Sequence, residues 1–248
     1  MKLYKCVSFA SSYWPYIAQE RKIRFATIDE LLSGNDKEEF NHRWQTKSRF
    51  LGENAHFLKP RYESLFSKTV ILSFGMSPNK KCWEVYCGKG GVRYEFELSE
   101  EVLKESDVSN RTVSYDDSKT FNLPDYLIRL EKNSDIKSLL KKETELSHLD
   151  KMQLLCWLNT GIPSETTLNH VTDEIVFKKE CKYAFEDEFR LVHLTSPIGN
   201  DALKVQLHEQ KIDLSSLGLN LINISTSDIN EVRQRIGDPS ISVSEISF

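Results

Sequence analysis

The sequence predicts an α+β fold in which most strands pair antiparallel. Strand-like runs occur at intervals in the first hundred residues, and apolar residues at three- and four-residue steps fill the middle, from about 124 to 160. Strand-like runs then resume after residue 174, and this order of strands, helices and strands is typical of the class. No repeat or low-complexity linker divides the chain, so we expect one domain over 1–248 with a helical insert at about 124–160.

The N-terminal elements are short. Residues 3–7 and 23–25 predict two strands, and the segment 13–21 between them has the length and spacing of a helix. Residues 38–67 are polar, aromatic and basic, and their apolar positions keep helical spacing. We therefore expect one or two helices in 38–67.

The clearest strand patterns lie at 69–74 and 92–98. The first is a continuous apolar and β-branched run, which is typical of a strand buried on both faces. The second alternates strictly, with Val92, Tyr94, Phe96 and Leu98 on one face and charged residues on the other. This alternation predicts a half-buried strand.

Gly161 and Pro163 are placed to end the last helix of the insert. Strand-like runs return after it. The expected elements are strands at 174–177, 188–194, 203–207, 219–224 and 241–246, with a capped helix at 227–236.

Composition limits the function classes. The chain has 33 Lys and Arg against 37 Asp and Glu, a net charge of −4, so any contact with nucleic acid must be a local patch. The five cysteines are scattered, the N-terminus lacks the layout of a signal peptide, and no run of about 18 apolar residues occurs. We expect a cytoplasmic protein without a membrane span. Only Cys82 and Cys87 lie close in sequence, and without a second pair they predict no metal site.

The most unusual stretch runs from Tyr183 to Arg190. If it is a strand, Glu186, Glu188 and Arg190 share one face, and Phe185 faces the core. Two carboxylates this close drive one pKa up while the arginine pulls the nearer one down, which separates an acid from a base. The alternative is a solvated strand face with a weak surface ion pair.

A second block combines Ser73, Trp83 and Tyr86. A hydroxyl at a strand end and two aromatic rings at i and i+3 of a short helix form a wall that can stack a flat ring. The alternative is that both rings belong to the core.

Two further patterns are open to more than one interpretation. Asp173, Glu180 and Lys182 loosely match the acidic-then-Glu-x-Lys layout of nucleases that use a divalent metal ion. The basic and aromatic residues between 43 and 62 suit either a phosphate backbone with stacked bases or a solvated amphipathic helix.

The blocks in their order resemble a widespread prokaryotic family of unknown function. The matching positions are Leu3-Tyr4-Lys5, Asn35-Asp36 with Glu39, Ser73-Phe74, Trp83-x-x-Tyr86, Gly91-Val92 with Glu95-Phe96, Val113-x-Tyr115, Lys178 or Lys179, and Glu186-x-Glu188-x-Arg190. The chain departs from the family pattern at Lys37-Glu38, which replaces Pro-Phe, at Gly75, which replaces a serine, and at Tyr183, which replaces a tryptophan.

That layout is in turn similar to ADP-ribosyltransferases, including toxin-like enzymes of toxin–antitoxin and antiphage systems that modify nucleic acids. The resemblance implies split, mainly antiparallel sheets around a cleft that holds NAD as substrate. It also implies an RNA or DNA acceptor and an antitoxin or chaperone as partner. Glu188 takes the role of the catalytic glutamate, and Glu186 that of the group that activates the acceptor. The positions that the resemblance assigns to NAD are Tyr4, Lys5, Arg24, Ser73, Trp83, Tyr86 and Arg190.

Three hypotheses remain at this point. A transferase requires Glu188 and consumes NAD, a metal nuclease is stopped by EDTA, and a non-catalytic module binds a nucleotide or peptide without turnover.

Overall fold

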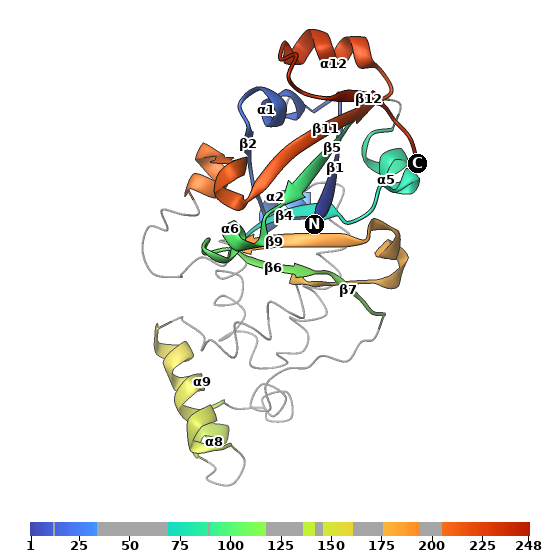
Figure 1. Ribbon diagram of the computed structural model, residues 1–248. Helices are drawn as coiled ribbons and strands as arrows, with labels where there is room; N and C mark the ends of the chain where they lie inside the picture. Colours follow the sequence, from blue (N-terminus) through green and yellow to red (C-terminus); the bar gives the residue numbers. More distant parts are fainter. Residues whose placement is uncertain are drawn as a thin grey trace.

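The computed structural model describes residues 1–11, 13–33, 69–88, 90–117, 136–141, 146–160, 176–193 and 205–248 (Figure 1). The predicted helices within 38–67 and the residues Gly161, Pro163 and Asp173 lie outside these ranges.

The described residues form a mixed α+β structure around one mainly antiparallel sheet, in the strand order β12-β11-β5-β1-β4-β9-β6, with β3 paired to β4. Its strands are β1 (Lys2–Ser8), β3 (Ala26–Thr27), β4 (Val70–Gly75), β5 (Gly91–Leu98), β6 (Ser109–Thr112), β9 (Glu188–His193), β11 (Leu219–Thr226) and β12 (Val243–Glu245). Two small sheets pair β10 (Ile212–Asp213) with β2 (Lys22–Ile23), and β7 (Ser114–Tyr115) with β8 (Lys178–Lys179).

Strand β5 follows the predicted alternation. Val92, Tyr94 and Phe96 are fully buried on one face, while Glu97 on the other face is exposed. The strand pairs antiparallel with β1 along its length and with β11 on its other side. The exception is Arg93, which lies on the charged face and is nevertheless buried.

The sheet divides between β1 and β4. These strands pair at a single point, where Tyr4 lies opposite Gly75, whereas β4 and β9 pair along their whole length. One half therefore contains β12, β11, β5 and β1, and the other contains β4, β9 and β6. Figure 1 shows β9 and β6 running across the direction of β5 and β11.

Helices flank the sheet. α1 (Trp14–Gln19) and α12 (Ile229–Ile236) lie together beside the β11 half, and α5 (Lys80–Tyr86) lies beside β1 (Figure 1). The other α-helices of the described ranges are α2 (Ile28–Ser33), α6 (Glu100–Lys104), and α8 (Ile136–Lys141) and α9 (His148–Thr160) within the predicted insert. None of the helices in the described ranges is long and apolar enough to cross a bilayer.

Two expected strands are wrong in their described parts. Val176 and Phe177 are not in a strand, and β8 begins directly after them. The end of 203–207 belongs to a π-helical segment, Val205–Gln210, in place of a strand. There the carbonyl of Leu207 accepts a hydrogen bond from the Phe25 backbone N–H, and the His208 ring lies 2.9 Å from the Phe25 carbonyl. These contacts anchor a helical turn against the chain near β2.

Candidate active site

A cavity of about 350 Å³ lies where β1 and β4 part. Its lining includes Tyr4 and Lys5 from β1, residues 71–75 of β4, and Tyr86 at the end of α5. The predicted site residues that line it are Tyr4, Lys5, Arg24, Ser73, Tyr86, Glu186, Glu188 and Arg190.

Trp83 lies elsewhere. It is 7% exposed, and its ring packs edge-on against Phe248 with centroids 6.4 Å apart. Of the two rings expected to form a stacking wall, Tyr86 is therefore the one that reaches the cavity.

The strand register places Glu188 in the cavity. Gly75 lies opposite Glu188 on one side and opposite Tyr4 on the other, and directly opposed residues project from the same face of a sheet. Because Gly75 has no side chain, nothing projects between Tyr4 and Glu188 at this position. A Cβ on Gly75 would lie 3.3 Å from the carbonyl oxygen of Glu186, which is a tight contact.

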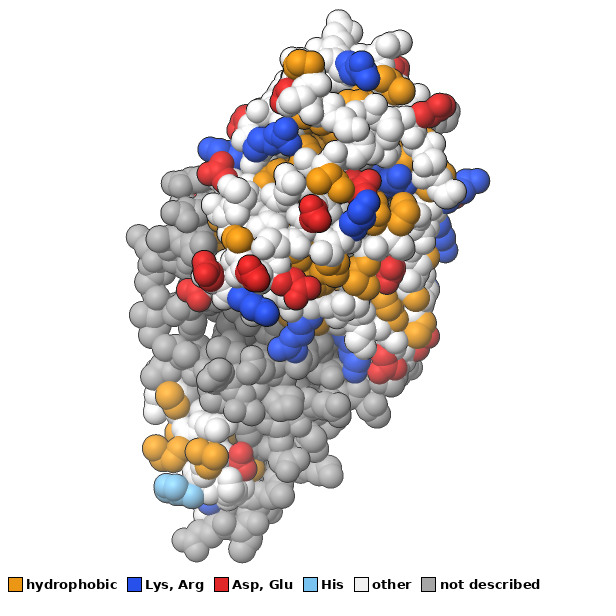
Figure 2. Space-filling model, in the orientation of Figure 1, with side chains coloured by type: hydrophobic (Ala, Val, Ile, Leu, Met, Phe, Trp, Pro, Cys, Tyr) orange, Lys and Arg blue, Asp and Glu red, His pale blue; other side chains and the backbone are white. Residues whose placement is uncertain are grey.

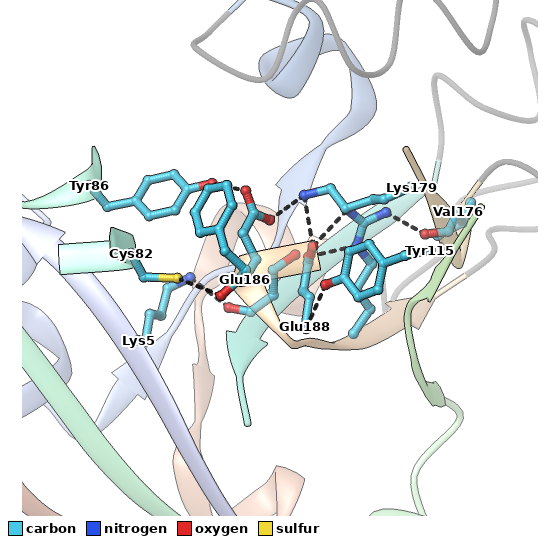
Figure 3. Close-up of polar contacts among 11 residues, drawn as sticks. Lys5, Cys82, Tyr86, Tyr115, Val176, Lys179, Glu186 and Glu188 are labelled. Carbon is cyan, nitrogen blue, oxygen red and sulfur yellow. Dashed lines mark hydrogen bonds and ion pairs between the residues drawn. The ribbon is translucent and has the colours of Figure 1, made fainter. Parts of the chain in front are cut away.

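Glu188 is buried and fully bonded (Figure 3). Arg190 donates from Nε to Oε1 at 2.7 Å and from Nη2 to Oε2 at 3.1 Å, and Lys179 Nζ lies 2.8 Å from Oε2. Burial alone favours the protonated acid, but Arg190 and then Lys179 outweigh it and hold the pKa of Glu188 well below its usual range. Glu188 is therefore an ionised carboxylate at any ordinary pH.

Tyr115 supports Glu188 from the backbone side. The Glu188 N–H donates to the Tyr115 hydroxyl at 2.8 Å, and the Glu188 carbonyl accepts from the Val113 N–H at 2.8 Å. Burial raises the pKa of Tyr115 to about 12, so its hydroxyl stays protonated.

The backbone that brings Glu186 into the site is not the expected strand. Residues Cys181–Glu186 form a 3₁₀ helix, and Asp187 follows in the left-handed region at φ 45° before β9 begins at Glu188. The expectation of a continuous strand through Glu186 and Phe185 is therefore wrong, and alternation does not set the direction of Glu186. The left-handed turn instead places its side chain beside Lys179 (Figure 3).

The carboxylate of Glu186 has two donors. Lys179 Nζ lies 2.5 Å from its Oε2, and the Tyr86 hydroxyl donates to its Oε1 at 2.7 Å. Burial raises the pKa of Glu186, and the charge of Glu188 adds to this effect, although Lys179 opposes it. One ammonium thus bridges a carboxylate held ionised and a carboxylate that takes up a proton more readily. Because Glu186, Glu188 and Arg190 are all less than 8% exposed, the alternative of a solvated face is wrong.

Asn79 joins the 3₁₀ helix to α5. Its Oδ1 caps α5 by accepting from the N–H groups of Lys81 and Cys82, at 2.8 and 3.4 Å, and its Nδ2 donates to the Phe185 carbonyl at 2.6 Å. One side chain therefore fixes Tyr86 and Glu186 relative to each other. Burial raises the pKa of Cys82 to about 12, so its thiol is not a nucleophile at neutral pH.

Lys5, Arg24 and Arg93 are further cations of the described lining. Lys5 donates to the Ser73 carbonyl at 3.1 Å, and Arg24 pairs with Glu30 at 2.8 Å. Arg190, which the resemblance assigns to NAD, is bonded to Glu188. The sequence-based assignment missed Arg93 and gave Lys179 only as one of two matching lysines. In the sequence, Arg93 stands out only as the one cation on the strand face that it shares with Glu95 and Glu97.

Glu180 and Lys182, the two described residues of the nuclease hypothesis, are not among the residues that line this cavity. Lys182 Nζ lies 2.8 Å from Glu180 Oε2 at a partly exposed site, and Asp173 lies outside the described residues. Within the described ranges, no three His, Cys, Asp or Glu side chains are grouped so as to hold a metal ion.

No protein-family model, curated protein or solved structure matches the chain.

Proposed function

We propose that the chain is an ADP-ribosyltransferase that uses NAD as substrate and modifies RNA or DNA. The observation that carries this proposal is the pair of carboxylates in the cavity between β1 and β4, with Glu188 held ionised and Glu186 beside it with a raised pKa. The split-sheet architecture of ADP-ribosyltransferases is part of the same proposal, supported by the single pairing point of β1 and β4.

Glu188 suits the bond-breaking step. When the bond between the ribose C1′ and the nicotinamide nitrogen breaks, its electron pair leaves with nicotinamide and C1′ gains oxocarbenium character. A fixed carboxylate stabilises this charge, as in glycoside hydrolysis. Arg190 and Lys179 hold the Glu188 carboxylate in one position, so it needs no reorganisation during the reaction.

Glu186 suits the acceptor step. The acceptor attacks C1′ with an N–H or O–H group and must lose its proton. A carboxylate with a raised pKa is a better base than an ordinary one, and Glu186 is the carboxylate whose pKa is raised here. The Tyr86 hydroxyl, which donates to Glu186 at 2.7 Å, orients this group.

The acceptor and the biological setting belong to the proposal as well. Figure 2 shows basic and acidic side chains interspersed on the described face in view, which agrees with a nucleic acid bound locally at the site instead of over a broad basic surface. We place such an enzyme in antiphage defence or in a toxin–antitoxin system, restrained by an antitoxin or chaperone protein.

The test incubates purified protein with isotope-labelled NAD and a mixture of RNA, DNA and lysate proteins, and follows both nicotinamide release and label transfer. Glu188→Gln should lose both activities. Glu84→Gln, whose side chain is 60% exposed on α5, is the matched control and should keep them.

Absence of nicotinamide release from folded wild-type protein would contradict the proposal. Equal release from Glu188→Gln would contradict it too. Absence of release would favour a binding module without turnover, whereas equal release from Glu188→Gln would mean that another group carries the reaction. Cleavage of the nucleic acid that EDTA stops and NAD does not affect would favour the nuclease.

A further inference from the structure

Arg93 differs from Arg24, Lys179 and Arg190, three other cations of the cavity. Among the described lining residues, five are Lys or Arg and two are Glu. Lys179 and Arg190 pair with the two lining glutamates, and Arg24 pairs with Glu30. Arg93 has no carboxylate partner among the described residues, although it is only 5% exposed.

The contacts of Arg93 are with neutral groups. Its Nη1 donates to the Ser247 carbonyl at 3.0 Å, and its Nη2 lies 3.4 Å from the Ser225 hydroxyl. Its Nε has no hydrogen-bond partner among the described residues. A buried cation without an anion is costly, and so is a buried donor without an acceptor. Both features indicate that an anion belongs at this position.

Two aromatic rings flank the guanidinium. Its carbon lies 5.7 Å from the centroid of Tyr4 and 5.6 Å from that of Phe248. Cation–π contacts hold a guanidinium without using its N–H groups, and the planar fork of these groups matches the oxygens of a phosphate. The opposing pair Cys6 and Arg93 places the side chain on the same sheet face as Tyr4, which lies in one row with Glu188.

We propose that Arg93 forms a phosphate-binding subsite of this cavity. An entering phosphate oxygen replaces the neutral Ser247 and Ser225 partners and occupies the Nε and Nη donors. The phosphate could belong to the diphosphate of NAD or to the phosphodiester of a nucleic-acid acceptor, which share this chemistry. The choice of these two sources rests on the function proposed above.

The test titrates inorganic diphosphate into the full chain by calorimetry. Arg93→Gln should raise the Kd roughly 10- to 100-fold, the loss expected for charge-assisted hydrogen bonds. Arg235→Gln is the control, because Arg235 is half-exposed and pairs with Glu231 on α12, and it should bind diphosphate as wild type does. Circular dichroism and thermal melting establish that each variant is folded.

If Arg93→Gln does not fold, Arg93→Lys keeps the charge and loses the fork, and it should bind several-fold more weakly than wild type. Unchanged affinity in the folded variant would overturn the subsite, as would absence of diphosphate binding by wild type. Parallel titrations with NAD and with a short single-stranded RNA identify the source, because only the ligand that reaches Arg93 should bind Arg93→Gln less tightly.

The failure of this inference is distinguishable from the failure of the proposed function. The diphosphate titration contains neither NAD nor acceptor. A chain that binds diphosphate through Arg93 and never releases nicotinamide keeps the subsite and loses the transferase. If the chain cleaves NAD and its affinity for diphosphate does not depend on Arg93, the transferase proposal stands and the subsite is refuted.

Discussion

Lys179→Met removes the ammonium that bridges Glu186 and Glu188. The Nζ atom lies 2.5 Å from one carboxylate and 2.8 Å from the other, and all three side chains are at most 8% exposed. Breaking a buried ion pair from one side costs about 3–5 kcal/mol of stability, because the remaining charge stays buried. We expect a loss of that size at a pH where both glutamates are ionised.

The loss should depend on pH. The pKa of Glu186 is already raised in the folded protein, and removal of Lys179 raises it further. A group whose folded pKa is raised contributes stability below its unfolded pKa, and this contribution disappears as the pH rises through the folded pKa. The variant should therefore be closer to wild type near pH 5 than near pH 8. The difference is about 1.4 kcal/mol for each unit by which the pKa of Glu186 rises.

Urea denaturation of wild type and variant at both pH values measures this effect. Lys182→Met is the matched control in the adjacent 3₁₀ helix, because Lys182 pairs with Glu180 at 2.8 Å but is 57% exposed, and it should cost at most about 1 kcal/mol. A loss for Lys179→Met that is below about 1 kcal/mol, or equal at the two pH values, would refute the coupling of the two glutamates through Lys179.

Three further outcomes are expected. Glu188→Gln should lower nicotinamide release about 10²- to 10³-fold, and chromatography of the products measures it; a smaller loss would argue against charge stabilisation at this carboxylate. In wild type, label transfer should rise with pH through an apparent pKa above the 4.5 of an ordinary glutamate, and Glu186→Gln should remove this pH dependence; a variant profile like that of wild type would assign the base elsewhere. Gly218→Ala should destabilise the protein more than Gly237→Ala in thermal melts, because both glycines have φ 68° but only at Gly218 would a Cβ lie 2.5 Å from the Ser99 carbonyl oxygen; equal losses would mean that the φ angle alone sets the cost.

The spacing of apolar residues in the sequence correctly predicts strands β4 and β5. The alternation of β5 and the apolar run of β4 each identify a strand, because burial on one or both faces of a strand leaves a direct trace in the sequence. The same rule correctly places Glu188 and Arg190 on one face of β9, where their side chains meet at 2.7 Å. The assignment of these residues to one site therefore follows from spacing alone.

The direction of the Glu186 side chain could not be predicted from such patterns. Its direction is set by Asp187, a residue other than glycine in a left-handed conformation, which the sequence does not signal. Contacts from distant segments fix this turn: the Met76 N–H donates to the Asp187 carbonyl at 2.7 Å, and Asn79 binds the Phe185 carbonyl. Met76 and Asn79 are both distant from this turn in sequence. The spacing within 183–190 therefore predicted which residues form the site, but it predicted a strand where the backbone is a 3₁₀ helix and a turn.

The cavity itself depends on one side chain in β1. Where two strands part, the backbone groups that face the gap lose their ladder partners and need others. At this gap the Ser73 carbonyl accepts from Lys5 Nζ at 3.1 Å, so an ammonium supplies a donor that a neighbouring strand would otherwise supply. Lys5 also lies 5.7 Å from the centroid of Phe74, which keeps its stem against the core. The lysine that the resemblance assigned to NAD thus has a structural task as well, because it stabilises the open edge of β4 and so maintains the space in which Glu186 and Glu188 meet.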